Sequence, residues 1–448
     1  MGELRAALDA ADRSLPDFVW RELSRYVECG DPEQGFAWLE CRCGHHRFLP
    51  FSCKGRGFCP GCGGRRMAER SARWDEAVLP HVPHRQWVLT VPWARRKQLA
   101  FRPELAQGVL GVALQEVFGW LEARAEADLG VTGARACAVT VEQRFASSLA
   151  LNLHFHSLLP DGVFSRAAQG GLLFHRMRPT RADLERLVER IADRCEVWLE
   201  AEGVDDDEVD PDDAQAVLVA ASAAGRVAAG PRAGQAVRRW RDLPPAAGDQ
   251  EQAPSDGVTA RGYGLHAGTW VPAQDRAALR RLARYLLRPP LAKARLEQRP
   301  DGLLLLTMRK PWRDGTTGFV YSPLEWTEKL AALVLRPHVR NVHFHGVFAS
   351  RSAWRADVVA FGRPSPPPER ADSDQESAPS LLPSPNPRMP SRRQAWCPWA
   401  ELLEQEFGTN GLRCPRCGGV LHLRTVVVGP PATTKILASL ARSSRAPP

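Results

Sequence analysis

The stretch Leu151-Asn-Leu-His-Phe-His-Ser-Leu-Leu-Pro-Asp-Gly162 has the alternation of a β-strand that ends in a turn. Because successive side chains of a strand point to opposite faces, its leucines and Phe155 can enter a core. His154 and His156 then converge on one point outside that core. Two neutral imidazoles at this spacing suit a divalent metal once a third ligand joins them. Such a pair can also serve only as hydrogen-bonding groups, so the surrounding sequence has to decide.

Length and composition set the class of protein. The chain has 448 residues, enough for two or three domains, and 44% of them are hydrophobic, enough for real cores. It contains no run of about eighteen apolar residues and no signal-peptide core at its start. We therefore expect a soluble, cytoplasmic protein with no membrane partner. The net charge of +9 indicates a polyanionic partner.

Periodicity predicts strands and helices that interleave along the chain. Strands are expected at 86–92, 136–143, 151–160 and 341–349, and a hairpin at 303–307 and 317–321. Helices are expected at 103–128, 181–202 and 275–288, the second capped by Thr180, and another opens with Ser322-Pro-Leu-Glu325 as a capping box. The elements lack the regular spacing of a parallel sheet, which favours an α+β fold.

Shifts in composition predict the domain boundaries. Residues 1–78 hold a cysteine cluster and a basic stretch, and residues 79–360 hold most of the predicted elements. Within the latter, residues 203–260 turn acidic and then Ala/Gly/Pro-rich, which indicates a flexible insertion. Residues 361–392 are dense in proline and serine, as a disordered linker would be. Residues 393–448 form a small C-terminal segment.

Most of the eleven cysteines fall in tight clusters, which in a reducing compartment indicates metal rather than disulfides. Two knuckles lie fifteen residues apart and predict one tetrahedral zinc site of the ribbon type, formed by Cys41, Cys43, Cys59 and Cys62. Cys53 lies between the knuckles and could replace either of the first pair.

A basic stretch follows this cluster directly and includes Arg65 and Arg66, so the ribbon is expected to bind nucleic acid. A further knuckle, Cys414-Pro-Arg-Cys417, is a possible second zinc site without an obvious second half. Cys397 and His422 are its nearest candidate partners.

Tyr285 lies in the predicted helix 275–288, at the edge of its buried stripe. Arg281 and Arg288 share its side of the helix. A phenol between two guanidiniums can meet a phosphate. The alternative is an amphipathic tyrosine at the boundary of a core.

Several motifs now occur in a definite order. They are Ser52-Cys-Lys-Gly-Arg-Gly-Phe-Cys-Pro-Gly-Cys62, Gln86-Trp-Val-Leu-Thr-Val-Pro92, Gln143-Arg-Phe145, His154-Phe-His156, Arg284-Tyr-Leu-Leu-Arg-Pro-Pro-Leu-Ala292, Ser322-Pro-Leu-Glu-Trp326, His345-Gly-Val-Phe348 and Cys414-Pro-Arg-Cys-Gly-Gly419. Together they resemble the rolling-circle transposases of the IS91 group, within the HUH (His-hydrophobic-His) class of endonucleases. The resemblance covers nearly the whole chain apart from 203–260 and the proline-rich linker.

The resemblance implies an N-terminal zinc ribbon that binds DNA, residues 1–78. A catalytic domain, residues 79–360, follows it. This domain would be an HUH-endonuclease-like antiparallel sheet, an RRM- or ferredoxin-like palm, with helices on one face.

The resemblance also implies a mechanism. His154 and His156 would hold Mg²⁺ or Mn²⁺ against a phosphate of single-stranded DNA at the transposon ends. Gln143 is the first choice for the third ligand, with Glu142 or His345 behind it. Tyr285 would attack the phosphorus and form a 5′-phosphotyrosine. Imidazole favours Mn²⁺, whereas abundance in the cell favours Mg²⁺.

Two features depart from the two-tyrosine members of the group, whose second nucleophile lies four residues from the first. Here the flanking positions hold Arg281 and Pro289, so the chain resembles a single-tyrosine branch. A second pair, His343-Phe-His345, is interpreted as a secondary site or as packing.

Other functions remain open on the sequence alone. A non-catalytic zinc-ribbon nucleic-acid-binding protein would explain the charge and the knuckles but would leave the histidine pair and Tyr285 without a role. A metal hydrolase would use water as its nucleophile and would not depend on Tyr285. An inactive copy of a transposase is the third alternative.

Overall fold

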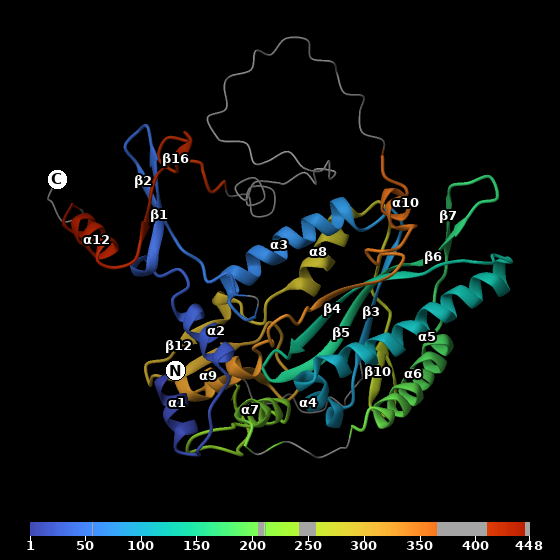
Figure 1. The fold of residues 1–448 in the computed structure, drawn as a ribbon, viewed down its shortest axis with the longest axis horizontal. Coiled ribbons are helices and arrows are strands. Elements are labelled where there is room, and N and C mark those ends of the chain that lie inside the picture. The colour runs from blue at the N-terminus through green and yellow to red at the C-terminus, as the bar shows by residue number, and fades with distance from the viewer. Residues whose placement is uncertain (56, 205–209, 211, 242–256, 365–409, 444–448) are drawn as a thin grey trace, which may run out of the picture.

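The computed structural model describes residues 1–55, 57–204, 210, 212–241, 257–364 and 410–443. At its centre lies a seven-stranded antiparallel sheet in the order β15-β4-β5-β3-β10-β9, with β11 paired to β3. Its strands are β3 (His84–Thr90), β4 (Cys137–Phe145), β5 (Leu151–Pro160), β9 (Gly257–Ala260), β10 (Tyr263–His266), β11 (Trp270–Val271) and β15 (Val342–Gly346). Helices and antiparallel strands are mixed along the chain, so the α+β class is confirmed (Figure 1).

The predicted histidine strand is β5, which pairs with β4 on one side and β3 on the other. Its register places His154 opposite Gln143 of β4, and His156 opposite Val141. Residues that pair directly across an antiparallel ladder share a face, so both histidines and Gln143 lie on the same side of the sheet.

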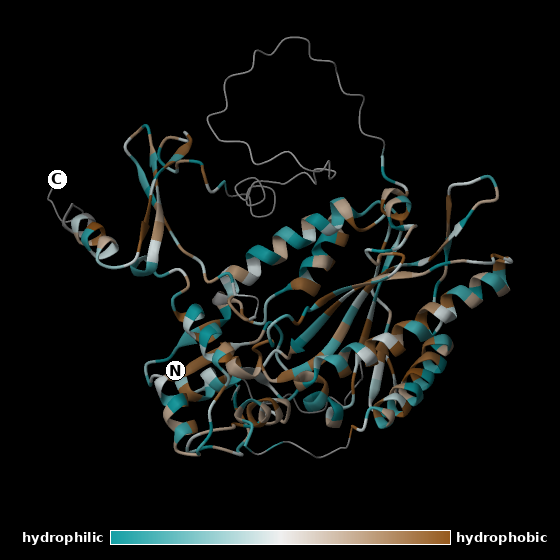
Figure 2. Cartoon of the chain, viewed as in Figure 1, coloured by the Kyte–Doolittle hydropathy of each residue, from teal (hydrophilic) through white to brown (hydrophobic). Residues whose placement is uncertain are grey.

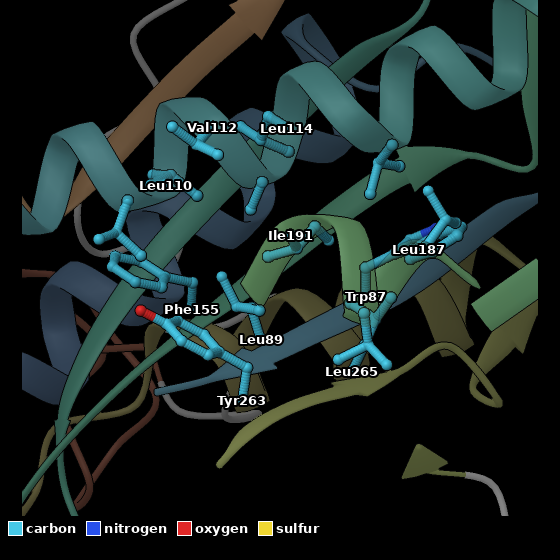
Figure 3. Close-up of a cluster of buried hydrophobic side chains, with 14 of the residues drawn as sticks. Trp87, Leu89, Leu110, Val112, Leu114, Phe155, Leu187, Ile191, Tyr263 and Leu265 are labelled. Atoms are coloured by element: carbon cyan, nitrogen blue, oxygen red, sulfur yellow. The ribbon is translucent and has the colours of Figure 1, made fainter. Parts of the chain in front are cut away.

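The other side of the sheet carries the largest core. Leu153 and Phe155 of β5 are buried against α5 (Pro103–Leu129) and α6 (Arg181–Ala201). Figure 3 shows Phe155 with Trp87 and Leu89 of β3 beneath side chains of both helices, labelled Leu110, Val112, Leu114, Leu187 and Ile191. Full burial of one such side chain stabilises the fold by about 1.5–3 kcal/mol. The apolar row of the strand therefore anchors the histidines.

The histidine side of the sheet is covered as well. Helices α3 (Pro60–Ala77) and α8 (Arg276–Leu287) pack there on Val139, Val141 and Leu158. The prediction that helices cover only one face of the sheet was therefore wrong, as Figure 1 shows. The physical reason is visible in β4, which is buried at eight consecutive positions and so requires cover on both faces.

A second layer contains helices α1 (Gly2–Asp9), α2 (Asp17–Val27), α4 (Trp93–Phe101), α7 (Ala214–Ala223) and α9 (Pro323–Ala332). They enclose a core with a four-stranded sheet of β12 (Leu296–Gln298), β13 (Leu304–Thr307), β14 (Thr316–Tyr321) and β8 (Arg238–Arg241). The β13–β14 hairpin and the Ser322/Glu325 capping box of α9 confirm two predictions. Smaller elements are η1 (Pro32–Gln34), β6 (Gly162–Arg166), β7 (Leu172–Arg176), η2 (Lys293–Arg295) and α10 (Arg355–Ala360).

The flexible insertion predicted at 203–260 needs correction. Its described residues form α7, β8 and β9, and β9 is the edge strand of the central sheet. Leu218 and Val219 of α7 are buried in the second core. Alanine-rich composition concealed this short apolar helix, whereas residues 205–209, 211 and 242–256 lie outside the described part.

The predicted C-terminal segment is not a separate unit. Strand β16 (Leu421–Val428) pairs antiparallel with β1 (Gly35–Cys41), which also pairs with β2 (His46–Pro50). Helix α12 (Ala432–Ser443) follows, and Figure 1 shows these elements together at one end of the molecule. The two ends of the chain thus build one sheet, a long-range pairing that no local pattern encodes. Most of the predicted linker, 365–392, lies outside the described residues.

Helices α3 and α6 are amphipathic. Figure 2 shows hydrophilic and hydrophobic residues alternating along α3 and α6. Within the described part of the chain, no helix combines the length and apolarity needed to cross a membrane.

Candidate active site

The two imidazoles of β5 lie side by side with their centroids 4.8 Å apart, and both side chains are buried. Nδ1 of His154 is 2.8 Å from the carbonyl oxygen of Asn152, so an Nδ1–H there donates and leaves Nε2 with its lone pair. Nδ1 of His156 is 2.7 Å from the side-chain amide of Gln86. Nε2 of His156 is buried and has no hydrogen-bond partner within the described residues. His154 therefore presents Nε2 as a metal donor, and His156 does so when the Gln86 amide turns its oxygen toward Nδ1.

The surroundings keep these rings neutral. Burial lowers the pKa of His154, and the guanidiniums of Arg288 and Arg96 add to the effect. Burial, His154 and Arg288 together lower the pKa of His156 to about 3. A neutral imidazole is the form that binds a metal.

Tyr285 is brought next to this pair by helix α8. The Asp275 side chain caps the helix by accepting from the amide of Ala278, and Leu279 and Leu286 bury one stripe. Tyr285 lies at the edge of that stripe and is 43% exposed, which leaves its ring open to a substrate. Its ring centroid is 5.9 Å from that of His156, in an edge-on arrangement.

The two arginines predicted beside Tyr285 differ in position. The guanidinium carbon of Arg288 lies 4.0 Å from the centroid of the Tyr285 ring. Arg281 is exposed on the preceding turn of α8. Of these two arginines, Arg288 is the one that contacts the Tyr285 ring.

The other three tyrosines are placed elsewhere. Tyr263 and Tyr321 are fully buried, and their hydroxyls donate to Glu196 and to the carbonyl oxygen of Ser148. Tyr26 packs on Phe58 near the N-terminus. Tyr285 is thus the tyrosine that the fold brings to the histidine pair.

Gln143 is the third polar side chain on this face. Its Nε2 donates to the carbonyl oxygen of Leu286 at 2.8 Å, which ties β4 to the end of α8. Its Oε1 is buried and finds no partner among the residues described. Glu142 pairs with Phe155 and His345 with Ala138, so both of these alternative ligands lie on the opposite face.

Gln86 was missed on the sequence. It reaches the Nδ1 atom of His156 from β3, as described above, and is itself buried. The available signal was an amide directly before the apolar run Trp87-Val-Leu89 of β3. Hydrogen bonds of this kind fix the orientation of a ligating histidine.

The second histidine pair lies on the far side of the same sheet. His343 pairs with Thr140 and His345 with Ala138, which places both on the face of α5. Burial together with His343 lowers the pKa of His345 to about 4.

A basic cleft of about 550 Å³ opens beside the candidate site, between α3, the end of α8 and the strands β4 and β15. Gln143 and Phe145 lie in its wall. The described lining contains one acid, Glu142, whose carboxylate accepts from Arg144 at 3.2 Å. Its remaining arginines come from four segments and are Arg66, Arg70, Arg73, Arg288, Arg340 and Arg355. Such a lining attracts a polyanion.

The cysteines form two clusters, and their grouping differs from the predicted one. In each cluster the four sulfur atoms lie within 4.8 Å of one another. The first cluster consists of Cys29, Cys53, Cys59 and Cys62, and the second of Cys41, Cys43, Cys414 and Cys417.

The predicted zinc set of Cys41, Cys43, Cys59 and Cys62 is therefore wrong in its grouping. Cys41 ends β1 and Cys43 lies in the turn to β2, whereas Cys59 and Cys62 begin α3. The two knuckles therefore belong to different clusters. Cys29, a lone cysteine after α2, was missed.

Cys53 is a full member of the first cluster, together with Cys29, rather than an alternate. The number of clustered cysteines could have indicated two sites, because two sites with four cysteine ligands each require eight cysteines. His422 belongs to neither cluster, and Cys397 lies outside the described residues.

The first cluster fits a structural zinc ion. Backbone amides of Cys53 and Gly55 donate to the sulfurs of Cys29 and Cys53, each at 3.3 Å, as around thiolates. Arg66 donates to the carbonyl oxygens of Gly55 and Lys54 and so fastens the loop after Cys53 to α3, while Arg65 points outward. Four cysteines and no open position make a closed site.

Helix α3 also links this cluster to the helix of Tyr285. Asp75 of α3 pairs with Arg276 and, at 3.0 Å, with Arg280 of α8. At the other end of α3, a Cβ atom on Gly63 would lie only 2.6 Å from Cβ of Pro289. The cluster and the candidate nucleophile thus sit at the ends of two tightly packed helices.

Comparison with known families agrees with this arrangement. A transposase zinc-binding domain family matches residues 3–91, and a transposase family matches residues 137–355. No curated protein and no solved structure matches the chain. The first match contains the whole first cysteine cluster, and the second contains the histidine strand and Tyr285. By these two matches, in this order along one chain, the protein belongs to the IS91 group of transposases.

Proposed function

We propose that this transposase nicks single-stranded DNA at the transposon ends and transfers the strand through a covalent bond to Tyr285. Transposases bind and rearrange DNA, and the chemistry here is of the HUH type. One observation carries the proposal, the 5.9 Å between the ring centroids of Tyr285 and His156. At this distance the exposed phenol of Tyr285 lies next to the buried, neutral imidazoles of His154 and His156.

His154, His156 and Gln143 would hold the divalent ion, Mg²⁺ or Mn²⁺. The fit rests on donor atoms of one sheet face, including the unpartnered Nε2 of His156 and Oε1 of Gln143 among the described residues. When bound, the ion supplies a positive charge that polarises a phosphoryl oxygen. Gln86 and the carbonyl oxygen of Asn152 hold the rings in place.

The covalent step conserves the phosphodiester. The phenolic oxygen of Tyr285 forms a bond to phosphorus, and the bond from phosphorus to the 3′-oxygen breaks. The phenol gives up its proton to solvent, and the 3′-oxygen gains one. The 5′-phosphotyrosine retains the bond energy, so a 3′-hydroxyl can reverse the step without ATP. Arg288 lies on the Tyr285 ring and can donate hydrogen bonds to the phosphate.

We place the bound strand in the basic cleft. Arginines from α3, α8 and the segment before β15 line it, and they suit a phosphate backbone. Phe145 and Phe344, also in the wall, are of the type on which unpaired bases stack. The strand would run past Gln143 toward Tyr285.

A labelled oligonucleotide from a transposon end tests the proposal. The protein is incubated with it and Mn²⁺, and the products are separated on a denaturing gel. The wild type should give a slowly migrating protein–DNA adduct, and Tyr285→Phe should lose it while binding the oligonucleotide with unchanged affinity. Tyr26→Phe, a change of a tyrosine that packs on Phe58, is the matched control and should keep the adduct.

Two other results would replace the proposal with an alternative. Cleavage without an adduct, equal in Tyr285→Phe, would indicate a hydrolase that uses water. Binding without any cleavage would indicate a non-catalytic DNA-binding protein or an inactive copy.

A further inference from the structure

We propose that the second cysteine cluster is a separate zinc site that joins the two ends of the chain. Its ligands would be Cys41 and Cys43 from the N-terminal hairpin and Cys414 and Cys417 from the C-terminal segment. The two C-terminal cysteines lie outside both family matches, which end at residue 355.

The sulfur positions have the dimensions of a tetrahedral zinc centre. Sγ of Cys41 lies 3.4 Å from Sγ of Cys417, and Sγ of Cys43 lies 3.7 Å from Sγ of Cys414. Ligands at about 2.3 Å from a tetrahedral zinc are separated from one another by about 3.8 Å. A disulfide requires about 2.05 Å, and all four cysteines are free. The spacing thus matches four thiolates around one ion.

In each half of the cluster, the glycine after the second cysteine closes a turn onto the first cysteine. The amide of Gly44 donates to the carbonyl oxygen of Cys41, and that of Gly418 donates to the carbonyl oxygen of Cys414, both at 2.9 Å. Both glycines have a positive φ, +77° and +72°, which lets the chain reverse after the second cysteine. The amide of Gly419 then lies 3.4 Å from Sγ of Cys417 as a donor to sulfur. These are two zinc knuckles facing each other.

Strand pairing brings the two knuckles together. Strand β1 pairs with β16 from Gly35↔Val428 to Cys41↔Leu421, so the last pair lies next to the cluster. Beneath it, Leu39 and Leu421 form a core with Cys41 and Cys414 alone among the described residues. An apolar core this small is too weak to hold a sheet by itself, and small modules of this kind depend on a metal. The zinc would therefore stabilise the sheet of both chain ends.

Metal content of the full-length protein tests this inference. The purified wild type should contain two zinc ions per chain by mass spectrometry of the metal. The double variants Cys414→Ser/Cys417→Ser and Cys41→Ser/Cys43→Ser should each contain one, and so should the combination of all four changes. Arg416→Ala, within the same knuckle, is the matched control and should retain two.

The Cys414→Ser/Cys417→Ser variant separates this grouping from the one that the sequence predicts. If Cys41 and Cys43 shared an ion with Cys59 and Cys62, the Cys414→Ser/Cys417→Ser variant would keep the full zinc content, and the inference would be wrong. One zinc per wild-type chain would also overturn it.

Cobalt titration of the metal-free wild type avoids any dependence on variants that fold poorly. The sulfur-to-cobalt absorption band should saturate at two equivalents, and saturation at one would contradict the second site. Neither measurement depends on DNA cleavage, so this inference and the proposed function stand or fall separately.

Discussion

At the residue scale, Gln86 decides which nitrogen of His156 is available. The nitrogen of the Gln86 amide lies at Nδ1, and a metal-binding Nε2 requires this amide to be rotated so that its oxygen accepts from Nδ1–H. Such a contact typically contributes 10- to 100-fold in metal affinity or activity. The candidate site thus includes a residue that touches neither ion nor DNA.

The two histidine pairs of the sheet provide a matched comparison. His154→Ala/His156→Ala should abolish binding of Mn²⁺ at the site and lower the nicking rate by at least about 100-fold, because the ion loses its donors. His343→Ala/His345→Ala removes the same groups from the opposite face and should change nicking less than about threefold. Calorimetric Mn²⁺ titration and single-turnover nicking measure both. Equal losses in the two variants would contradict the assignment of the ligands to one face.

At the scale of elements, the packing of α3 on α8 positions Tyr285. Asp75 pairs with two arginines at one end of the contact, and Gly63 lies against Pro289 at the other. Pro289 follows the last turn of α8, so a shift there would move the helix that carries Tyr285. Position 63 requires glycine because the neighbouring Pro289 leaves no space for a Cβ atom.

Adjacent glycines of α3 test this contact. Gly64→Ala has open space around its Cβ and should raise the free energy of unfolding by about 0.5–1 kcal/mol, since alanine favours a helix. Gly63→Ala meets Pro289 and should lower that free energy by about 1–3 kcal/mol and slow adduct formation. Urea unfolding and the adduct gel measure the two effects. A Gly63→Ala variant as stable and active as Gly64→Ala would show that the helices are not in close contact.

The start of α6 predicts a pH-dependent contribution to stability. Burial by itself raises the pKa of the Asp183 carboxyl, but hydrogen bonds from Thr180 and the charge of Arg124 outweigh it, so this pKa lies below its usual 3.8. A carboxyl with a lowered folded-state pKa stabilises the fold above its unfolded pKa, and the contribution disappears as pH falls through the folded-state value.

Asp183→Asn should therefore reduce the free energy of unfolding by about 1 kcal/mol at pH 7, the usual contribution of such a cap. The difference from the wild type should shrink as the pH falls below about 4. Asp128→Asn, an exposed partner of the same Arg124, should have little effect at either pH. Urea denaturation across this pH range measures the difference, and a gap independent of pH would contradict the role of the ionised carboxyl.

At the scale of the whole molecule, arginines from separate parts of the sequence meet in one cleft. The net charge of +9 says only that an anionic partner is expected. The fold places Arg70 of α3 and Arg340, just before β15, in the lining of the same cavity. The fold thus places these positive charges in one cleft, where the expected DNA would bind.

Salt dependence of binding tests the cleft. Arg70→Gln/Arg340→Gln should reduce the slope of log affinity against log salt concentration for single-stranded DNA by about 1.4, or about 0.7 for each lost phosphate contact. Arg181→Gln/Arg261→Gln removes two exposed cations from the far side of the sheet and should leave the slope unchanged. Fluorescence anisotropy at a series of salt concentrations gives the slopes, and equal slopes in all proteins would place the DNA elsewhere.

Sequence reasoning succeeded where short-range patterns carry the information. The helices α5, α6, α8 and α9 and the strands β3, β4, β5 and β15 lie close to their predicted positions. Thr180 and Ser322 cap the helices as expected, because a cap involves residues only three positions apart. The region 203–260 failed because its short apolar segments fall within low-complexity sequence.

The sequence by itself determined which face of each strand and helix is buried. It therefore also determined that His154 and His156 point to the same side and that Tyr285 borders a buried stripe. Alternation and helical period act over a few residues, so they can be read directly. Only the tertiary structure decided which distant groups meet: Tyr285 with His156, Gln86 with His156, and Cys41 with Cys417 across 376 positions of sequence. These meetings follow from strand register and from the packing of whole helices, which depend on the sum of many weak contacts rather than on any local signal.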